Sequence, residues 1–165
     1  MAVLEQVARF TDGPQQTDAF GLMPWQRRKV FSGAAKILTA ADSGALCLWT
    51  TAAGYLFTLP AITVENIGMW FDFNVHTTIT SVGAKVITSS GDFLVGSFIQ
   101  SPDSTTLLAA HAANGTTHVS WNGDGTTTGG YSGDFFRVTS INGTQWLIFG
   151  LGLATGTEAT PFATS

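Results

Sequence analysis

The strictest alternation of apolar and polar residues in this chain spans positions 67–75. Every second residue there is large and apolar: Ile67, Met69, Phe71, Phe73 and Val75. Successive side chains of a strand point to opposite faces, whereas a helix would scatter these five around its axis. The pattern predicts a strand with one face in a core and with Trp70 and Asp72 on the opposite face.

Short apolar runs separated by turn residues fill most of the remaining chain. We expect further strands at 35–39, 46–50, 55–59, 78–82, 85–88, 93–98, 117–121, 135–141 and 144–153. Segment 107–113 fits either a short helix or a strand, and its flanking residues favour a strand. Asn142-Gly143 suits a type I′ turn between the last two strands. Many short strands without helices between them predict an all-β fold, either a jelly-roll-like or a Greek-key β-sandwich.

Two predicted strands carry large apolar residues on both faces. Trp70 lies opposite the core face of strand 67–75, and Trp146 shares with Ile148 the face opposite Leu147, Phe149, Leu151 and Leu153. In so small a domain, such strands suggest burial between subunits. We therefore expect Trp70, Asp72 and Trp146 at a subunit interface. An exposed tryptophan could instead stack on a sugar ring, so carbohydrate binding stays open as an alternative.

Charge divides the 165 residues into unequal parts. Residues 1–36 hold five cations against three acids, and the remainder holds two against eight, which sums to the net charge of −4. Only 11% of residues are charged, compared with about a quarter in typical domains. A body with so few cations is not expected to bind nucleic acid. We expect an extended N-terminal arm over 1–33, a β-sandwich body over 34–153 and a C-terminal tail over 154–165, with little to hold that tail unless another subunit covers it.

The arm combines aromatic and basic residues. Met23-Pro24-Trp25 precedes Gln26-Arg27-Arg28-Lys29, and the proline disfavours a helix. Two interpretations remain open, a solvated terminus and an extended segment that orders on a partner. In the second, the partner-binding residues are Phe20, Trp25, Arg27, Arg28 and Lys29.

No catalytic or metal-binding motif is recognisable. His76, His111 and His118 lack metal-ligand spacing, although His111 and His118 could face each other across Asn114-Gly115. The loop at Asn122-Gly123-Asp124-Gly125 lacks the acidic residues of a calcium-binding EF-hand and is better explained by Asx turns. Cys47 lies in an apolar run, which favours a buried thiol. We expect neither an enzyme nor a cofactor or metal site.

The sequence also shows none of the apolar patterns typical of targeting or membrane-spanning segments. Glu5 and Arg9 interrupt any apolar run near residue 1, so no secretory signal peptide is expected. No apolar stretch reaches the length of about 18 residues that a membrane span needs. We therefore expect no membrane partner.

A series of short strand and turn motifs runs through roughly residues 36–153. In chain order they are Thr39-Ala40-Ala41-Asp42-Ser43-Gly44, Phe57-Thr58-Leu59-Pro60, the strand from Gly68 to Val75, Val86-Ile87-Thr88 with Gly91-Asp92, and Gly143-Thr144-Gln145-Trp146-x-Ile148-x-Gly150. With these motifs the body resembles small β-structured virion proteins of tailed bacteriophages, especially capsid decoration (cement) proteins, and related modules of tail fibres.

This resemblance implies a jelly-roll-like homotrimer on the outer capsid surface, made in the host cytoplasm and carried in the virion. Its partners would be the major capsid protein and further copies of itself, with the arm lying across neighbouring capsid subunits. A protein that binds only the assembled shell would stabilise it by mass action. A tail-fibre or receptor-binding module that binds host surface carbohydrate is the alternative.

Overall fold

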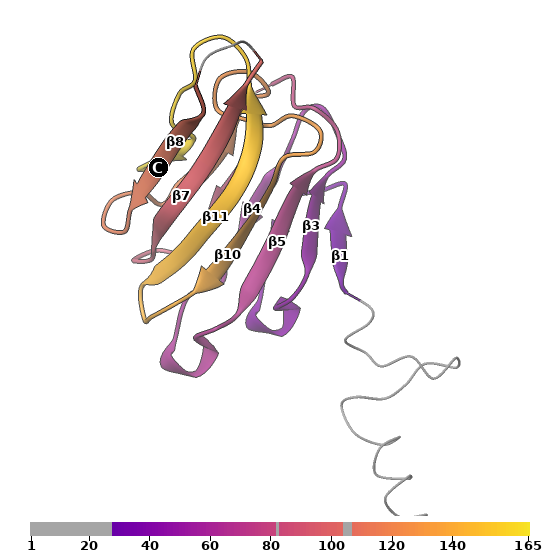
Figure 1. Ribbon diagram of the computed structural model, residues 1–165. Helices are drawn as coiled ribbons and strands as arrows, with labels where there is room; N and C mark the ends of the chain where they lie inside the picture. Colours follow the sequence, from indigo (N-terminus) through magenta and orange to yellow (C-terminus); the bar gives the residue numbers. More distant parts are fainter. Residues whose placement is uncertain (1–27, 82, 104–106) are drawn as a thin grey trace, which may run out of the picture.

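Alternating apolar residues produce two β-sheets packed face to face in the computed structural model, which describes residues 28–81, 83–103 and 107–165 (Figure 1). The seven-stranded sheet has the order β1 (Val30–Ser32), β3 (Leu46–Trp49), β5 (Trp70–Val75), β10 (Phe135–Ser140), β11 (Gln145–Ala154), β7 (Phe93–Pro102), β8 (Ala109–Asn114). The five-stranded sheet has the order β12 (Phe162–Ala163), β9 (Ser120–Gly123), β6 (Ala84–Ile87), β4 (Leu56–Thr58), β2 (Lys36–Ile37). The prediction of an all-β sandwich is confirmed.

The first six strands alternate between the two sheets. In the seven-stranded sheet, β1, β3 and β5 are therefore parallel neighbours, and in the other sheet β2, β4 and β6 are. Short 3₁₀ segments, η2 (Ala40–Asp42) and η3 (Val64–Asn66), lie in two of these crossovers. The later strands add antiparallel pairs, so both sheets are mixed. Sequence patterning left the strand order open, because it does not record which strands are neighbours.

The core between the sheets is a cluster of stacked aromatic rings. Trp121 and Phe136 have ring centroids 4.5 Å apart, Phe73 stacks on Phe136 at 5.0 Å, and Trp49 packs on Phe73 at 5.7 Å. All four side chains are at most 1% exposed. Such pairs contribute about 0.5–1.5 kcal/mol each beyond the area that they bury. The sandwich is thus held by rings contributed from both sheets.

The strand predicted at 67–75 begins three residues later than expected. Met69, Phe71, Phe73 and Val75 point into the core as predicted. Ile67 does not: it is 48% exposed, since it caps the turn η3 before the strand begins at Trp70. Within the ambiguous segment 107–113, residues from Ala109 onward form a strand, β8, whereas residues 78–81 form none.

The hairpin predicted at 135–153 is confirmed, but its turn is not the expected type. Strands β10 and β11 pair antiparallel, with Ser140 opposite Trp146. Gly143 does not have the positive φ that a type I′ turn requires. Instead, the Asn142 side-chain oxygen accepts a hydrogen bond from the Thr144 N–H at 3.0 Å, which is an Asx turn.

Both predicted domain boundaries need correction. Residues 30–32, assigned to the arm, form β1 and pair with β3. Residues 154–165, expected to lack support, are held by their own chain: Phe162 is 5% exposed in the core, and the Ser165 carbonyl accepts hydrogen bonds from Lys85 and Ser120. The body therefore includes residues 28–33 and reaches Ser165. The rest of the predicted arm lies outside the described residues.

Candidate interaction surface

The seven-stranded sheet has one face in the core and one facing outward, and β11 shows the difference most clearly. Trp146 and Ile148 are 0% exposed and point into the core. On the outward face of the same strand, Leu147, Phe149 and Leu151 are 42%, 60% and 58% exposed. A strand that is apolar on both faces can bury only one of them within a two-sheet sandwich.

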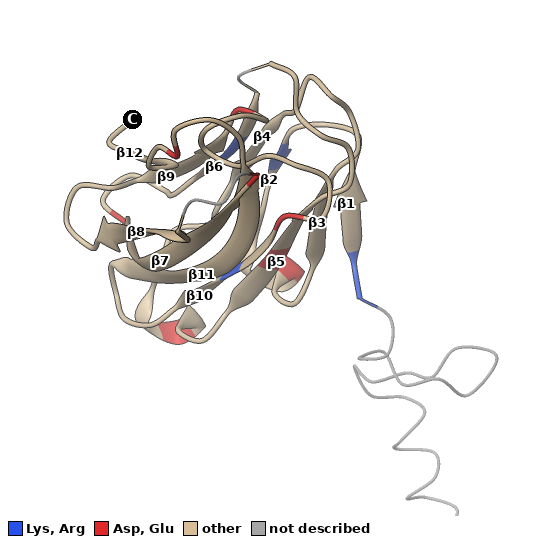
Figure 2. Cartoon of the chain, turned by 45° about the horizontal axis from the view of Figure 1, so that its top comes forward, with Lys and Arg blue, Asp and Glu red and all other residues tan. Residues whose placement is uncertain are grey.

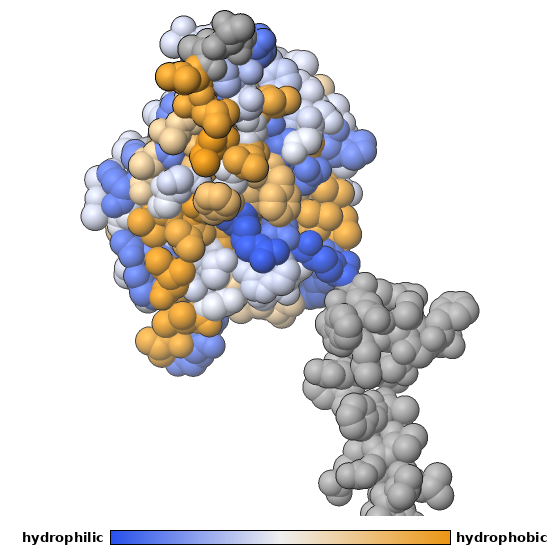
Figure 3. Space-filling view, in the orientation of Figure 1, coloured by the Kyte–Doolittle hydropathy of each residue, from blue (hydrophilic) through white to orange (hydrophobic). Residues whose placement is uncertain are grey.

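Exposed apolar side chains run along the outward face of β11 and its neighbour β10. We name them the apolar strip: Phe135, Leu147, Phe149, Leu151 and Leu153. Phe135 pairs across the strands with Leu151, so the two strands contribute to one continuous surface. Figure 3 shows this apolar surface running across the front of the molecule beside a patch of hydrophilic residues. The rest of the body carries few charges (Figure 2).

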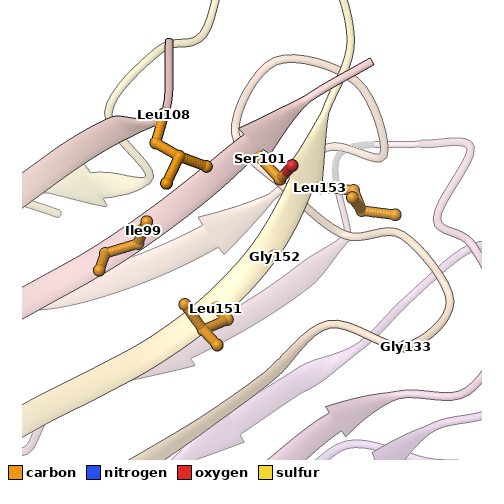
Figure 4. Close-up of a pocket in the computed structure, with 7 residues that line it drawn as sticks. All are labelled: Ile99, Ser101, Leu108, Gly133, Leu151, Gly152 and Leu153. Carbon is orange, nitrogen blue, oxygen red and sulfur yellow. The ribbon is translucent and has the colours of Figure 1, made fainter.

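At the upper end of the strip lies a shallow apolar groove between β7 and β11 (Figure 4). Ile99, Leu108, Leu151 and Leu153 line it, and Ser101 provides a polar side chain. Its volume is about 330 Å³, which is at the lower end of the range for small-molecule pockets. Apart from the Ser101 hydroxyl the lining is apolar, which suits the groove to an apolar side chain.

Beside the strip, two arginines enclose Trp70 and Asp72. Arg137 binds the Asp72 carboxylate through both oxygens, at 2.6 and 2.9 Å, and Arg28 adds a third contact at 2.8 Å. The two guanidinium groups also lie over the Trp70 ring, at 4.1 Å for Arg137 and 5.0 Å for Arg28. The hydrogen bonds to Asp72 raise the pKa of Arg137 above its ordinary value. Asp72 is 2% exposed, because the arginines cover it.

These contacts revise the predicted subunit-interface residues. Trp146 is wrong as an interface residue, because it is fully buried in the core of its own chain. Asp72 is also covered by its own chain and is only 2% exposed, so little of its carboxylate is accessible to a neighbour. Trp70 does lie on the outward face, half-buried, as the alternation predicted. Sequence reasoning missed the residues of the apolar strip. The alternation along 145–153 separates them from Trp146 and Ile148, but it does not show that they face outward.

Of the predicted arm residues, the structure places two. Arg28 contacts Asp72 and Trp70, and Lys29 donates to the Asp42 carboxylate at 3.0 Å and to the Ala41 carbonyl at 2.7 Å. Both cations therefore bind the body of their own chain. Phe20, Trp25 and Arg27 lie outside the described residues.

The remaining polar candidates have structural partners. His111 contacts the Gln100 side chain at 2.8 Å, while the ring of His118 accepts from the Asn114 N–H at 3.1 Å. Within the described residues, no group of three His, Cys, Asp or Glu side chains could hold a metal ion. Asp124 organises its glycine-rich loop: partial burial opposes its ionisation, but hydrogen bonds from Thr126, Thr127 and Thr128 lower its pKa to about 2.

Cys47 is fully buried in β3, and burial raises the pKa of its thiol to about 12. The thiolate is the reactive form, so almost none is present near neutral pH. We expect no reaction with a thiol reagent at pH 8 in the native protein and complete reaction after unfolding in guanidinium chloride. Rapid labelling of the native protein would contradict the buried position of Cys47.

None of the helical segments in the described part of the chain has the length and apolar character needed to cross a bilayer. Comparison with known proteins gives no further assignment: no family model, no curated protein and no solved structure matches this chain.

Proposed function

We propose that this chain is a structural protein of a tailed-bacteriophage virion, which binds the outside of the capsid shell and stabilises it as a homotrimer. The observation that carries the proposal is the apolar strip on the outward face of an otherwise well-packed sheet. Contiguous exposed apolar surface of this kind marks protein–protein contact in soluble proteins. The resemblance of residues 36–153 to decoration proteins supplies the class of partner, the major capsid protein together with other copies of the chain.

The positions of the tryptophans give little support to the carbohydrate-binding alternative. Trp49, Trp121 and Trp146 are 0% exposed and cannot meet a sugar. Trp70 is half-buried, and the guanidinium groups of Arg137 and Arg28 already lie over its ring. A flat aromatic platform open to a sugar is therefore not available among these four residues.

The copy number of the chain in purified virions tests the proposal. A copy number that follows the capsid lattice supports decoration, whereas one that matches the symmetry of the tail favours the tail-fibre alternative. Absence of the chain from virions would overturn both. The measurement is quantitative mass spectrometry against the major capsid protein.

We expect Phe149→Ser to weaken co-sedimentation with purified capsids at least tenfold, which corresponds to about 1.4 kcal/mol. Phe149 is 60% exposed, so its removal from the surface should leave the fold intact. A large aromatic side chain at the centre of a contact surface commonly contributes this much to binding.

Ile37→Ser provides the matched control. Ile37 is 72% exposed on β2, in the opposite sheet, so its loss removes exposed apolar surface at a site remote from the strip. Equal binding by both variants would show that the apolar strip is not the contact surface.

A further inference from the structure

The chain contains three Asn-Gly pairs, which begin at Asn114, Asn122 and Asn142. In such a pair the glycine nitrogen can attack the side-chain amide carbon of the asparagine, because glycine has no Cβ atom to obstruct the approach. The attack requires that the asparagine side chain can reach the following nitrogen and that this nitrogen is not engaged elsewhere. The fold places the three pairs in different environments, so their reactivity should differ.

The pair at Asn114 is held by hydrogen bonds. Gly115 is buried, and its N–H donates to the Leu94 carbonyl at 2.8 Å. The Asn114 side-chain oxygen accepts from the N–H groups of Thr116 at 3.0 Å and Thr117 at 2.9 Å, and its nitrogen donates to the Thr117 hydroxyl at 2.7 Å. The glycine nitrogen is therefore engaged, and the asparagine amide is fixed.

The pair at Asn122 lies inside a strand. Both residues belong to β9, where Asn122 is opposite Lys85 and Gly123 is opposite Ala84 of β6. The side chain of a strand residue stands out of the sheet, whereas the next backbone nitrogen lies in the sheet. Strand pairing therefore keeps the Asn122 amide away from the nitrogen of Gly123, which is also buried.

The pair at Asn142 is not protected in either way. Asn142 and Gly143 are exposed in the turn between β10 and β11, and nothing lies within 4 Å of a Cβ atom at Gly143. The Gly143 N–H has no hydrogen-bond acceptor among the residues that the structure describes. The Thr144 N–H donates to the Asn142 side-chain oxygen at 3.0 Å, so it can stabilise the negative charge that forms on this oxygen during the attack.

We propose that Asn142 is the site of spontaneous deamidation in this protein. The Gly143 nitrogen forms a bond to the side-chain amide carbon of Asn142, and the bond from that carbon to the side-chain nitrogen breaks. The proton of the Gly143 nitrogen passes through water to the departing group, which leaves as ammonia. Water then opens the cyclic imide at either of its carbonyl groups, which gives aspartate or isoaspartate at position 142.

This modification alters a contact between two turns. The Asn142 side-chain nitrogen donates to the Gln145 side-chain oxygen at 2.7 Å, and the Gln145 nitrogen donates to the Gly115 carbonyl at 2.9 Å. A carboxylate at position 142 can only accept hydrogen bonds. The single amide of Gln145 then lies between two acceptors and keeps only one of its two contacts. Deamidation therefore loosens the end of the two strands that carry the apolar strip.

Incubation of the purified full-length protein at pH 8 and 37 °C, followed by peptide mapping with mass spectrometry, tests the proposal. We expect deamidation at Asn142 to be at least tenfold faster than at Asn114 or Asn122, which corresponds to about 1.4 kcal/mol in activation free energy. Both aspartate and isoaspartate should be found at position 142. Equal rates at the three pairs, or a faster reaction at Asn114 or Asn122, would overturn the proposal.

Unfolded protein is the first control. In guanidinium chloride the three pairs should deamidate at similar rates, because the fold is what distinguishes them. A preference for Asn142 that stays the same after unfolding would contradict the structural explanation.

Gly143→Ala is the second control. The added Cβ atom obstructs the attack, so deamidation at Asn142 should slow several-fold while the circular dichroism spectrum stays unchanged. An unchanged rate in this variant would show that the nitrogen of residue 143 is not the attacking group.

Discussion

A Gly150→Ala variant is expected to lose about 3 kcal/mol of unfolding free energy, which corresponds to a fall in Tm of roughly 10 °C. Gly150 lies on the core face of β11, directly opposite Phe136 of β10. A Cβ atom at this position would be 2.2 Å from the Phe136 Cβ and 2.6 Å from the Phe135 carbonyl oxygen. Both are fixed by the backbone of the paired strand, so the two strands would have to separate. Urea unfolding at equilibrium measures the change.

Gly143→Ala in the same hairpin is the matched control. Nothing lies within 4 Å of a Cβ atom at Gly143, and its backbone does not have a positive φ. Its unfolding free energy should stay within about 0.5 kcal/mol of wild type. If Gly150→Ala were as stable as Gly143→Ala, the close approach of β10 and β11 described above would be wrong.

Asp134→Ala is expected to cost about 3 kcal/mol of stability. Asp134 is 2% exposed, and its carboxylate accepts backbone N–H groups from Gly130 at 2.7 Å, Tyr131 at 3.2 Å and Leu153 at 2.9 Å. The substitution leaves three backbone donors without their acceptor, and each such loss costs about 1–3 kcal/mol when the donor stays buried. Thermal and urea unfolding measure the effect. Glu65→Ala, which removes an exposed carboxylate in η3, should change stability far less.

The pH dependence of the unfolding free energy distinguishes the contribution of the Asp134 charge from that of its hydrogen bonds. Burial raises the pKa of this carboxyl above its ordinary value, against the three N–H groups that lower it. The native state therefore holds this proton more tightly than the unfolded state, so the stability that it contributes is complete at low pH and is lost as pH rises through the native pKa. Asp134→Asn should remove this component. A difference between wild type and Asp134→Asn that does not change with pH would contradict the raised pKa.

Trp146 illustrates what the sequence pattern could not predict, namely which face of a strand points into the core. Residues 145–153 alternate between two apolar sets, and period two identifies the sets without saying which one faces inward. Gly150 lies on the same face as Trp146 and Ile148, where it leaves room for Phe136 of the neighbouring strand. That packing partner comes from another strand, so the inward face became known only with the strand order.

Trp70 and Asp72 were placed correctly on the outward face of β5 by alternation, but their partners were not foreseen. Arg137 lies 65 positions after Asp72 in the sequence and comes beside it only because β10 pairs with β5 in this register. Arg28 reaches the same carboxylate from the segment before β1. The sequence suggested that a neighbouring subunit contacts Trp70 and Asp72. In the structure, two arginines of the same chain make these contacts.

By itself, the sequence determined the all-β class, most of the strands and the β10–β11 hairpin, because these depend on local alternation and turn residues. It also indicated the buried thiol of Cys47 and the Asx turns around Asp124. Only the tertiary structure decided the alternation of strands between the sheets, the inclusion of β1 and β12 in the body, and the outward position of the apolar strip. These features depend on contacts between residues far apart in the chain, and local periodicity carries no information about which strand becomes the neighbour of another.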